Sequence, residues 1–276
     1  MTKTWLITGI SSGFGLAMTK QLLAAGNTVI GTVRNTKKIA DLQKQYPKTL
    51  DSQVLDVTDV AAVHDVIQSA FQRHGKIDVL VNNAGYGLFG AAEELNDDQV
   101  AQIIATNLTG PIQVIRTALP FLRAQKSGHI IQISSYGGQV AYPGNSMYHA
   151  TKFGIEGFVE SVAQEVQAFG IGMTIVEPGG ARTEFRYGSA HVANLMPEYD
   201  GPTHSFLKML DPANGLAPGD PEKMASRIIE SVDQPDTPLH LVLGSQALQA
   251  TIQRLEERVA TYKTETEIAR STDYLD

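Results

Sequence analysis

Short apolar segments alternate with helical segments along most of this chain of 276 residues. The apolar runs that read as strands cover residues 4–8, 28–33, 53–55, 77–81, 128–133, 172–176 and 239–243. Helices are expected from the glycine-rich segment 9–15 to residue 25, and at 36–46, 59–74, 96–123, 145–168 and 221–232. Apolar strands that alternate with helices are typical of a parallel sheet covered on both faces. The pattern therefore predicts an α/β fold, with one doubly wound domain around a seven-stranded, mostly parallel sheet.

No internal repeat or linker divides the chain, so we expect a single domain over residues 1–276. Residues 185–219 carry four prolines and no clear period, which favours a functional lid over the substrate, although burial in short helices is equally compatible. Residues 245–276 read as a C-terminal helical extension. Its apolar stripe of Leu248, Ile252, Leu255 and Val259 favours packing on its own domain over binding of a partner.

The composition narrows the possible functions. The chain has no cysteine, which excludes disulfides, thiolate nucleophiles and cysteine-bound metals. Its net charge of −7 argues against nucleic acid as a partner, and its seven histidines form no helical metal-binding pair, so no metal is expected. No apolar run approaches the roughly 20 residues of a membrane span, and residues 1–6 enter a strand without the features of a signal peptide. We therefore expect a soluble cytoplasmic protein.

The segment between the first strand and the first helix, residues 8–15, reads T-G-I-S-S-G-F-G. Glycines at this place let the backbone approach a pyrophosphate at a helix N-terminus. The spacing G-x-x-x-G-x-G differs from the most familiar dinucleotide fingerprint, and a plain turn with structural glycines is the alternative. We expect a dinucleotide to bind here, at Gly9, Ser11, Ser12, Gly13, Phe14 and Gly15.

The ends of the next three strands supply further candidates. Arg34 follows the second strand, where folds that prefer NAD place an acid for the ribose 2′-hydroxyl. A guanidinium suits a 2′-phosphate instead, so we favour NADP(H) over NAD, against the alternative of an exposed arginine without function. Asp56 and Val57 follow the third strand in position for the adenine, although Asp56 also fits an ordinary loop acid. The N-N-A-G segment at 82–85 either packs beneath the nucleotide or forms a tight turn; its candidates are Asn83, Ala84 and Gly85.

Tyr148 and Lys152 stand four residues apart, so they share one face of the helix predicted over residues 145–168. A free phenol has a pKa of about 10, and a nearby ammonium lowers it toward the range of a general acid or base. Ser135, thirteen residues upstream, is placed to hold a substrate oxygen. Taken alone, a Tyr-x-x-x-Lys match is usually a solvated pair on a surface helix. The pair becomes informative when the rest of the chain brings a redox cofactor to it.

Taken together, these motifs resemble the short-chain dehydrogenase/reductase family in its classical form. The resemblance runs from about residue 3 to residue 243 and includes T-G-I-S-S-G-F-G, D-V, N-N-A-G, Asn107, Ser135, Y-H-A-T-K and P-G-G-A-R-T in order. The segment 87–90 and the V-R-N strand end are similar to the branch that contains 17β-hydroxysteroid and retinol dehydrogenases.

The resemblance implies a Rossmann-type fold and a role for each matched residue. Tyr148 would exchange a proton with the substrate oxygen, Lys152 would lower the Tyr148 pKa, and both would line the cofactor site. Ser135, rather than the adjacent Ser134, would bind the substrate oxygen. Asn107 would hold a water that relays protons to Lys152, unless its amide only caps a helix kink. The nicotinamide end would be contacted by Pro178, Gly179 and Thr183.

We therefore expect an NADP(H)-dependent oxidoreductase that interconverts a carbonyl and an alcohol. The large apolar and aromatic residues of segment 185–219 suggest a lipophilic small molecule as its substrate. The alternatives are a catalytically silent NADP(H)-binding sensor or scaffold, and an epimerase or dehydratase on the same fold. Members of the family are commonly dimers or tetramers, so the resemblance also implies a homo-oligomer.

Overall fold

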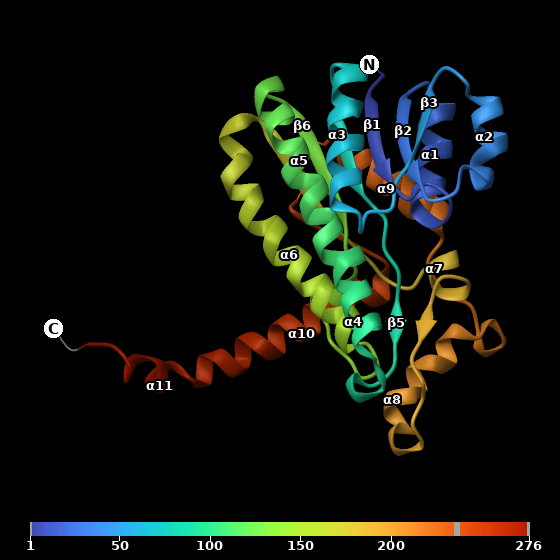
Figure 1. Ribbon diagram of the computed structural model, residues 1–276. Coiled ribbons are helices and arrows are strands. Elements are labelled where there is room, and N and C mark those ends of the chain that lie inside the picture. The colour runs from blue at the N-terminus through green and yellow to red at the C-terminus, as the bar shows by residue number, and fades with distance from the viewer. Residues whose placement is uncertain (1, 235–237, 275–276) are drawn as a thin grey trace.

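The computed structural model describes residues 2–234 and 238–274, and its core is one seven-stranded sheet in which every neighbouring pair of strands is parallel. The strands lie in the order β3-β2-β1-β4-β6-β7-β9 (Figure 1). Their bounds are β1 Thr4–Thr8, β2 Thr28–Val33, β3 Leu50–Val54, β4 Val79–Asn82, β6 Gly128–Ile133, β7 Ile171–Pro178 and β9 His240–Leu243. This confirms the predicted doubly wound, Rossmann-type fold.

Helices cover both faces of the sheet. One face is covered by α3 (Val60–His74), α5 (Gly110–Gln125) and α6 (Ser146–Val166), and the other by α1 (Gly13–Ala24) and α9 (Pro221–Ser231). Alternate residues of β1 serve the two layers, because Leu6 packs with the first set and Ile7 with the second. Asp59 caps α3, as predicted, by accepting a hydrogen bond from the Ala62 N–H at 3.0 Å.

Two predicted elements differ in detail. The third strand begins three residues before the predicted residue 53, because β3 lies at the sheet edge and tolerates polar, half-buried residues that hide the strand pattern. The polar helix predicted over 36–46 is divided into a 3₁₀ turn, Thr36–Ile39, and α2, Ala40–Gln45.

The helix predicted over 96–123 is also divided. It consists of α4 (Asp97–Ile104), a π-helical segment (Ala105–Thr109) and α5. Pro111 lacks the N–H that a continuous helix needs. Gly110 packs closely on the segment that follows β3, because a Cβ at Gly110 would be 2.8 Å from the Val57 carbonyl oxygen. Asn96 forms the predicted cap at the start of α4.

Segment 185–219 is not structureless. It contains the short helices α7 (Glu184–Tyr187) and α8 (Pro202–Ser205), several 3₁₀ turns, and β8 (His191–Val192), which pairs with β5 (Leu88–Phe89). It is anchored by Glu94, whose buried carboxylate accepts hydrogen bonds from the Met196 N–H and from the ring of His204. The segment therefore lies over the carboxyl ends of the strands, below the sheet in Figure 1.

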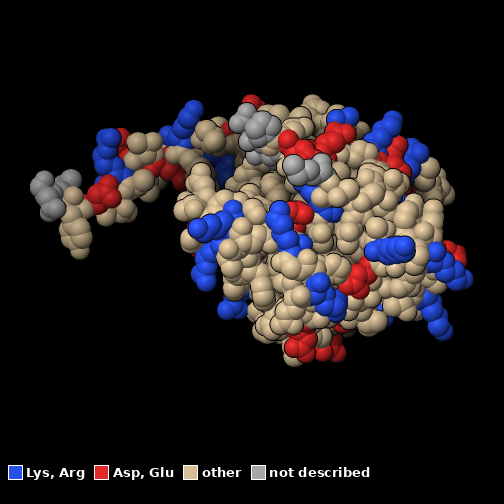
Figure 2. Space-filling model, turned by 90° about the horizontal axis from the view of Figure 1, so that it is seen from above, with Lys and Arg blue, Asp and Glu red and all other residues tan. Residues whose placement is uncertain are grey.

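The C-terminal extension forms α10 (Ser245–Thr264) and α11 (Thr266–Arg270), which extend away from the body as an arm (Figures 1 and 2). The expectation that its apolar stripe packs on its own domain is wrong. The arm contacts the body through Ala247, Thr251 and Arg258, whereas the four predicted stripe residues are 40–49% exposed. Within the described residues, no helix has the length and apolar character needed to cross a membrane.

Candidate active site

The glycine-rich segment turns from β1 into the N-terminus of α1. Gly9 and Gly13 have φ values of 74° and 53°, a region that side chains other than glycine rarely adopt. Ser12 precedes the helix in extended conformation, and its side chain does not cap the helix N–H groups. These N–H groups therefore remain available for an anion such as a pyrophosphate.

Asn83 ties the N-N-A-G segment to this loop. Its side-chain Nδ2 donates to the carbonyl oxygens of Thr8 and Gly9, both at 2.9 Å. The Thr8 hydroxyl in turn accepts hydrogen bonds from the N–H groups of Asn83 and Ala84. Asn83 is thus engaged in positioning the loop. Gly85, two residues after Asn83, lies against Asn107.

Replacing Gly15 by alanine is expected to destabilise the protein by about 1–3 kcal/mol and to weaken cofactor binding. The added Cβ would overlap the Gly9 carbonyl oxygen and lie 2.5 Å from Asn83 Nδ2. Thermal unfolding and NADPH titration measure both effects. Gly157→Ala is the matched control, since Gly157 lies in α6 with open space around it, and this change is expected to stabilise by up to about 1 kcal/mol. Equal stability of the two variants would contradict the close packing of the loop.

Arg34 is exposed just beyond the end of β2 and close enough to Asp56 to act on its titration. Burial raises the Asp56 pKa, but hydrogen bonds from Thr58 and the Arg34 charge outweigh it, so the net pKa is lowered. Both predicted residues therefore lie at the same edge of the sheet. Val57, by contrast, is buried and packs in the core.

The segment after β7 approaches the glycine-rich loop. A Cβ on Gly13 would lie 3.7 Å from the Thr183 Cβ, so Thr183 is next to the proposed phosphate site. Gly179 has a different neighbour, because its own Cβ would be 2.9 Å from the Ala247 Cβ at the start of α10. Pro178 ends β7 beside Leu243.

Tyr148 and Lys152 share one face of α6, as predicted, and both are buried. The Lys152 Nζ lies 5.6 Å from the centroid of the Tyr148 ring and donates to the Ile133 carbonyl oxygen at 3.0 Å. Ser135 is 7% exposed, accepts a hydrogen bond from the Gly137 N–H, and forms a hydrogen bond with the Tyr148 phenol. The structure therefore brings three of the four predicted catalytic residues together at the carboxyl end of β6.

The pKa of Tyr148 differs from the expectation based on sequence. Burial raises it to about 12, and the hydrogen bond with Ser135 only partly opposes this rise. Burial also lowers the pKa of Lys152 to about 8, opposed by the charge of Glu156. In the free protein, desolvation thus determines the direction of the Tyr148 pKa shift, and the phenol keeps its proton at neutral pH.

Asn107 lies in the π-helical segment and is 2% exposed. Its Nδ2 donates to the Tyr86 carbonyl oxygen at 2.8 Å, and its Oδ1 accepts from the Tyr86 N–H at 3.1 Å. The side chain thus joins the irregular helix to Tyr86 after the N-N-A-G segment, and these two hydrogen bonds do not cap the helix kink. Its role in holding a water stays a prediction. His149, next to Tyr148, contacts the Gly137 carbonyl oxygen through Nδ1 and accepts a hydrogen bond from the Tyr142 N–H at Nε2.

A cavity of about 320 Å³ lies between the segment after Ser135 and the lid. Aromatic rings stack along it, with Tyr142 5.0 Å from Phe206 and 6.0 Å from Tyr136 between ring centroids. The ring of His149 lies 4.5 Å from that of Tyr142 and 6.1 Å from that of Tyr148 between centroids, so the cavity lies near Tyr148. The lining residues are Tyr136, Tyr142, Pro143, Pro202, Ser205, Phe206 and Met209.

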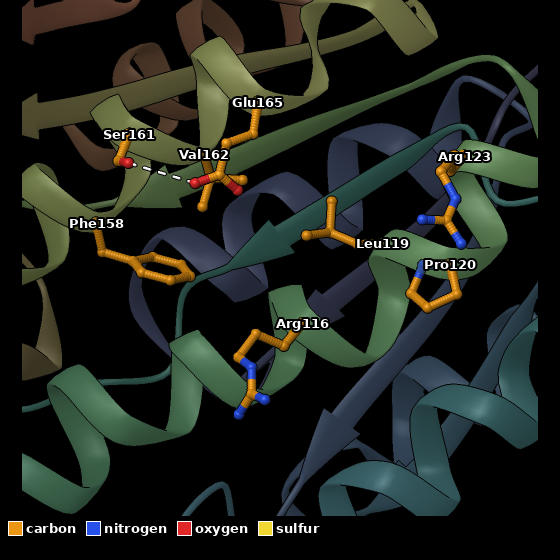
Figure 3. A pocket seen from close by; sticks show the side chains of 8 residues that line it. All are labelled: Arg116, Leu119, Pro120, Arg123, Phe158, Ser161, Val162 and Glu165. Atoms are coloured by element: carbon orange, nitrogen blue, oxygen red, sulfur yellow. Dashed lines mark hydrogen bonds between the residues drawn. The ribbon is translucent and has the colours of Figure 1, made fainter.

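A second hollow, of about 380 Å³, lies between α5 and α6 (Figure 3). Its α6 side begins at Phe158, ten residues beyond Tyr148, which is roughly 15 Å along a helix. This hollow is therefore separate from the catalytic residues.

Sequence reasoning missed two buried acids near the site, Glu94 and Glu156. Glu94 anchors the lid and has no motif of its own. Glu156 was detectable, because Tyr148, Lys152 and Glu156 follow one another at intervals of four residues and so continue along one helix face.

The sequence model of the short chain dehydrogenase family matches residues 3–191. A crystal structure of a short-chain dehydrogenase from Streptomyces avermitilis has 38% identity and a TM-score of 0.93, and the match covers 99% of this chain and 100% of that one. The 3-ketodihydrosphingosine reductase of Bacteroides thetaiotaomicron is 32% identical over 244 residues, which are 87% of each chain. The structure of ElxO with NADP bound has 26% identity and a TM-score of 0.74, over 90% of this chain and all of that one.

Proposed function

Because this chain belongs to the short-chain dehydrogenase family, it is an oxidoreductase, and we propose that it uses NADP(H) to interconvert a carbonyl and an alcohol on a lipophilic small molecule. The observation that carries the proposal is the meeting of Ser135, Tyr148 and Lys152 near an aromatic cavity, at the carboxyl end of the same parallel sheet from which the glycine-rich loop emerges. Bound nicotinamide supplies or accepts the hydride.

The residues of the chain move the proton and hold the substrate. In reduction, the Ser135 hydroxyl binds the carbonyl oxygen, and the Tyr148 phenol donates its proton to that oxygen as the alcohol forms. In the free protein the phenol carries its proton at neutral pH, because burial raises its pKa to about 12. The Lys152 ammonium stabilises the phenolate that remains.

NADP(H) is favoured over NAD by the exposed Arg34 and supported by the NADP bound to a structural relative. The lid and the segment after Ser135 supply mainly aromatic and apolar surface, which suits a lipophilic substrate. One relative of this chain is a reductase whose named substrate, 3-ketodihydrosphingosine, is a ketone.

A panel of ketones and aldehydes of increasing chain length, with NADPH consumption as the signal, tests the proposal. We expect kcat/KM to rise with apolar chain length until the cavity is filled. Tight NADPH binding without turnover on any carbonyl or alcohol would favour the silent sensor. Turnover without net NADPH oxidation would favour an epimerase or dehydratase.

A further inference from the structure

Glu156 lies at the back of the catalytic site and is 2% exposed. Its Oε1 accepts a hydrogen bond from the Ser134 hydroxyl, and its Oε2 accepts one from the Gln139 Nε2 at 2.6 Å. These two partners flank Ser135 and the turn that follows it. A Cβ on Gly138 would overlap Oε1, so the turn is packed directly onto the carboxylate. Glu156 thus clamps both ends of the segment that presents Ser135.

The same carboxylate is the acidic neighbour of Lys152. Lys152 is four residues from Tyr148 on one side and four from Glu156 on the other, all on one face of α6. Burial lowers the Lys152 pKa, and Glu156 is the charge that opposes this. A buried ammonium without a counter-charge tends to lose its proton, and a neutral lysine could not stabilise a phenolate.

Other titratable groups connect Glu156 to the protein surface. Glu177 on β7 is 1% exposed and binds His240 Nδ1 on β9 at 2.5 Å, and the His240 Nε2 is 3.4 Å from Glu160. A carboxylate oxygen of Glu156, a carboxylate oxygen of Glu177 and a ring nitrogen of His240 lie within 4.8 Å of one another. Burial raises the Glu156 pKa to about 7, Glu177 adds to the rise, and Ser134, Gln139 and His240 oppose it.

We propose that Glu156 is a positioning residue of the active site, which fixes the Ser135 segment against α6 and supplies the counter-charge that keeps Lys152 protonated. The inference rests on the proposed carbonyl reduction. Inactivity of the wild-type enzyme would overturn that function, whereas the role of Glu156 is judged from variants compared with an active wild type.

Glu156→Gln keeps the shape and one acceptor but removes the charge. Losing the anion lowers the Lys152 pKa further, so the neutral lysine appears at lower pH. We expect the alkaline limb of the kcat/KM profile to move down by about one pH unit or more. Glu156→Asp keeps the charge, so its alkaline limb should lie at the wild-type pH. Ser134→Ala, which loosens the clamp without a change in charge, should lower kcat and leave the limb in place.

Glu165→Gln, an exposed carboxylate on the same helix, is the matched control and should leave the profile unchanged. His240→Gln, at the partly exposed end of the network, provides a second measurement if Glu156→Gln does not fold. Removing that cation favours neutral Glu156, so the limb should again move to lower pH. An alkaline limb that stays at its wild-type pH in Glu156→Gln, or in His240→Gln if the first variant is unfolded, would overturn the counter-charge role.

A different observation carries a second inference, about the C-terminal arm. Its exposed apolar residues follow the spacing 4-3-4-3, which is the a/d seam of a coiled coil. With the β-branched Ile252 and Val259 at a and Leu248 and Leu255 at d, the residue types favour two strands. Tyr262 continues the seam at the next d position and is 62% exposed. We infer that the arm pairs with the arm of a second copy of this chain.

The double variant Ile252→Asp/Val259→Asp is expected to have a lower molar mass by light scattering than the wild type, because pairing of the arms would bury the new charges in the seam. Gln253→Asp/Ala260→Asp places the same charges at exposed positions one residue later on the helix and should keep the wild-type mass. A wild type that is monomeric at all concentrations, or a seam variant of unchanged mass, would reject the pairing.

Discussion

Replacing Tyr148 by phenylalanine is expected to lower kcat by about 10²–10⁴-fold, the usual contribution of a positioned general acid. The ring remains to fill its apolar surroundings next to Phe185, at 5.7 Å between ring centroids, so the fold and NADPH binding should be retained. Only the proton for the substrate oxygen is lost. Steady-state kinetics with NADPH, together with a titration of NADPH fluorescence, separate the two quantities.

Tyr142→Phe is the matched control for this experiment. Tyr142 is a second phenol, which lines the aromatic cavity and whose pKa is raised by burial. We expect Tyr142→Phe to change KM more than kcat. Turnover near the wild-type level in Tyr148→Phe would remove the phenol from the mechanism.

Replacing Arg34 by aspartate is expected to reduce the preference for NADPH over NADH, measured as the ratio of their kcat/KM values, by roughly 10–100-fold or more. Charge-assisted hydrogen bonds to a phosphate contribute about 1.5–3 kcal/mol, and the new carboxylate would in addition repel it. The same carboxylate could accept a hydrogen bond from the 2′-hydroxyl of NADH.

The difference in exposure between Arg34 and Val33 decides which of the two is replaced by aspartate. Val33 stands next to Arg34 at the end of β2, but it is 2% exposed and packs in the core, where a carboxylate would destabilise the fold. Lys48→Ala is the control, because Lys48 is another exposed cation on the chain. A ratio unchanged by Arg34→Asp would show that Arg34 does not read the 2′-phosphate.

Local patterns were sufficient for much of the fold. Strands β1, β2 and β6 and the Asp59 cap of α3 lie where the sequence predicted them, because apolar runs and caps depend on neighbouring residues. The pair Tyr148 and Lys152 was predictable for the same reason, since a separation of four residues fixes a shared helix face.

Only the tertiary structure decided the electrostatics of the site and the surroundings of the arm. The Tyr148 pKa rises because the phenol is buried, and burial depends on segments far away in the chain. Glu156, Glu177 and His240 come from three elements that meet only when the sheet forms. The apolar stripe on α10 has the same periodicity whether it packs on its own domain or on a partner. Periodicity shows that a helix face is apolar, but it does not show which surface covers that face.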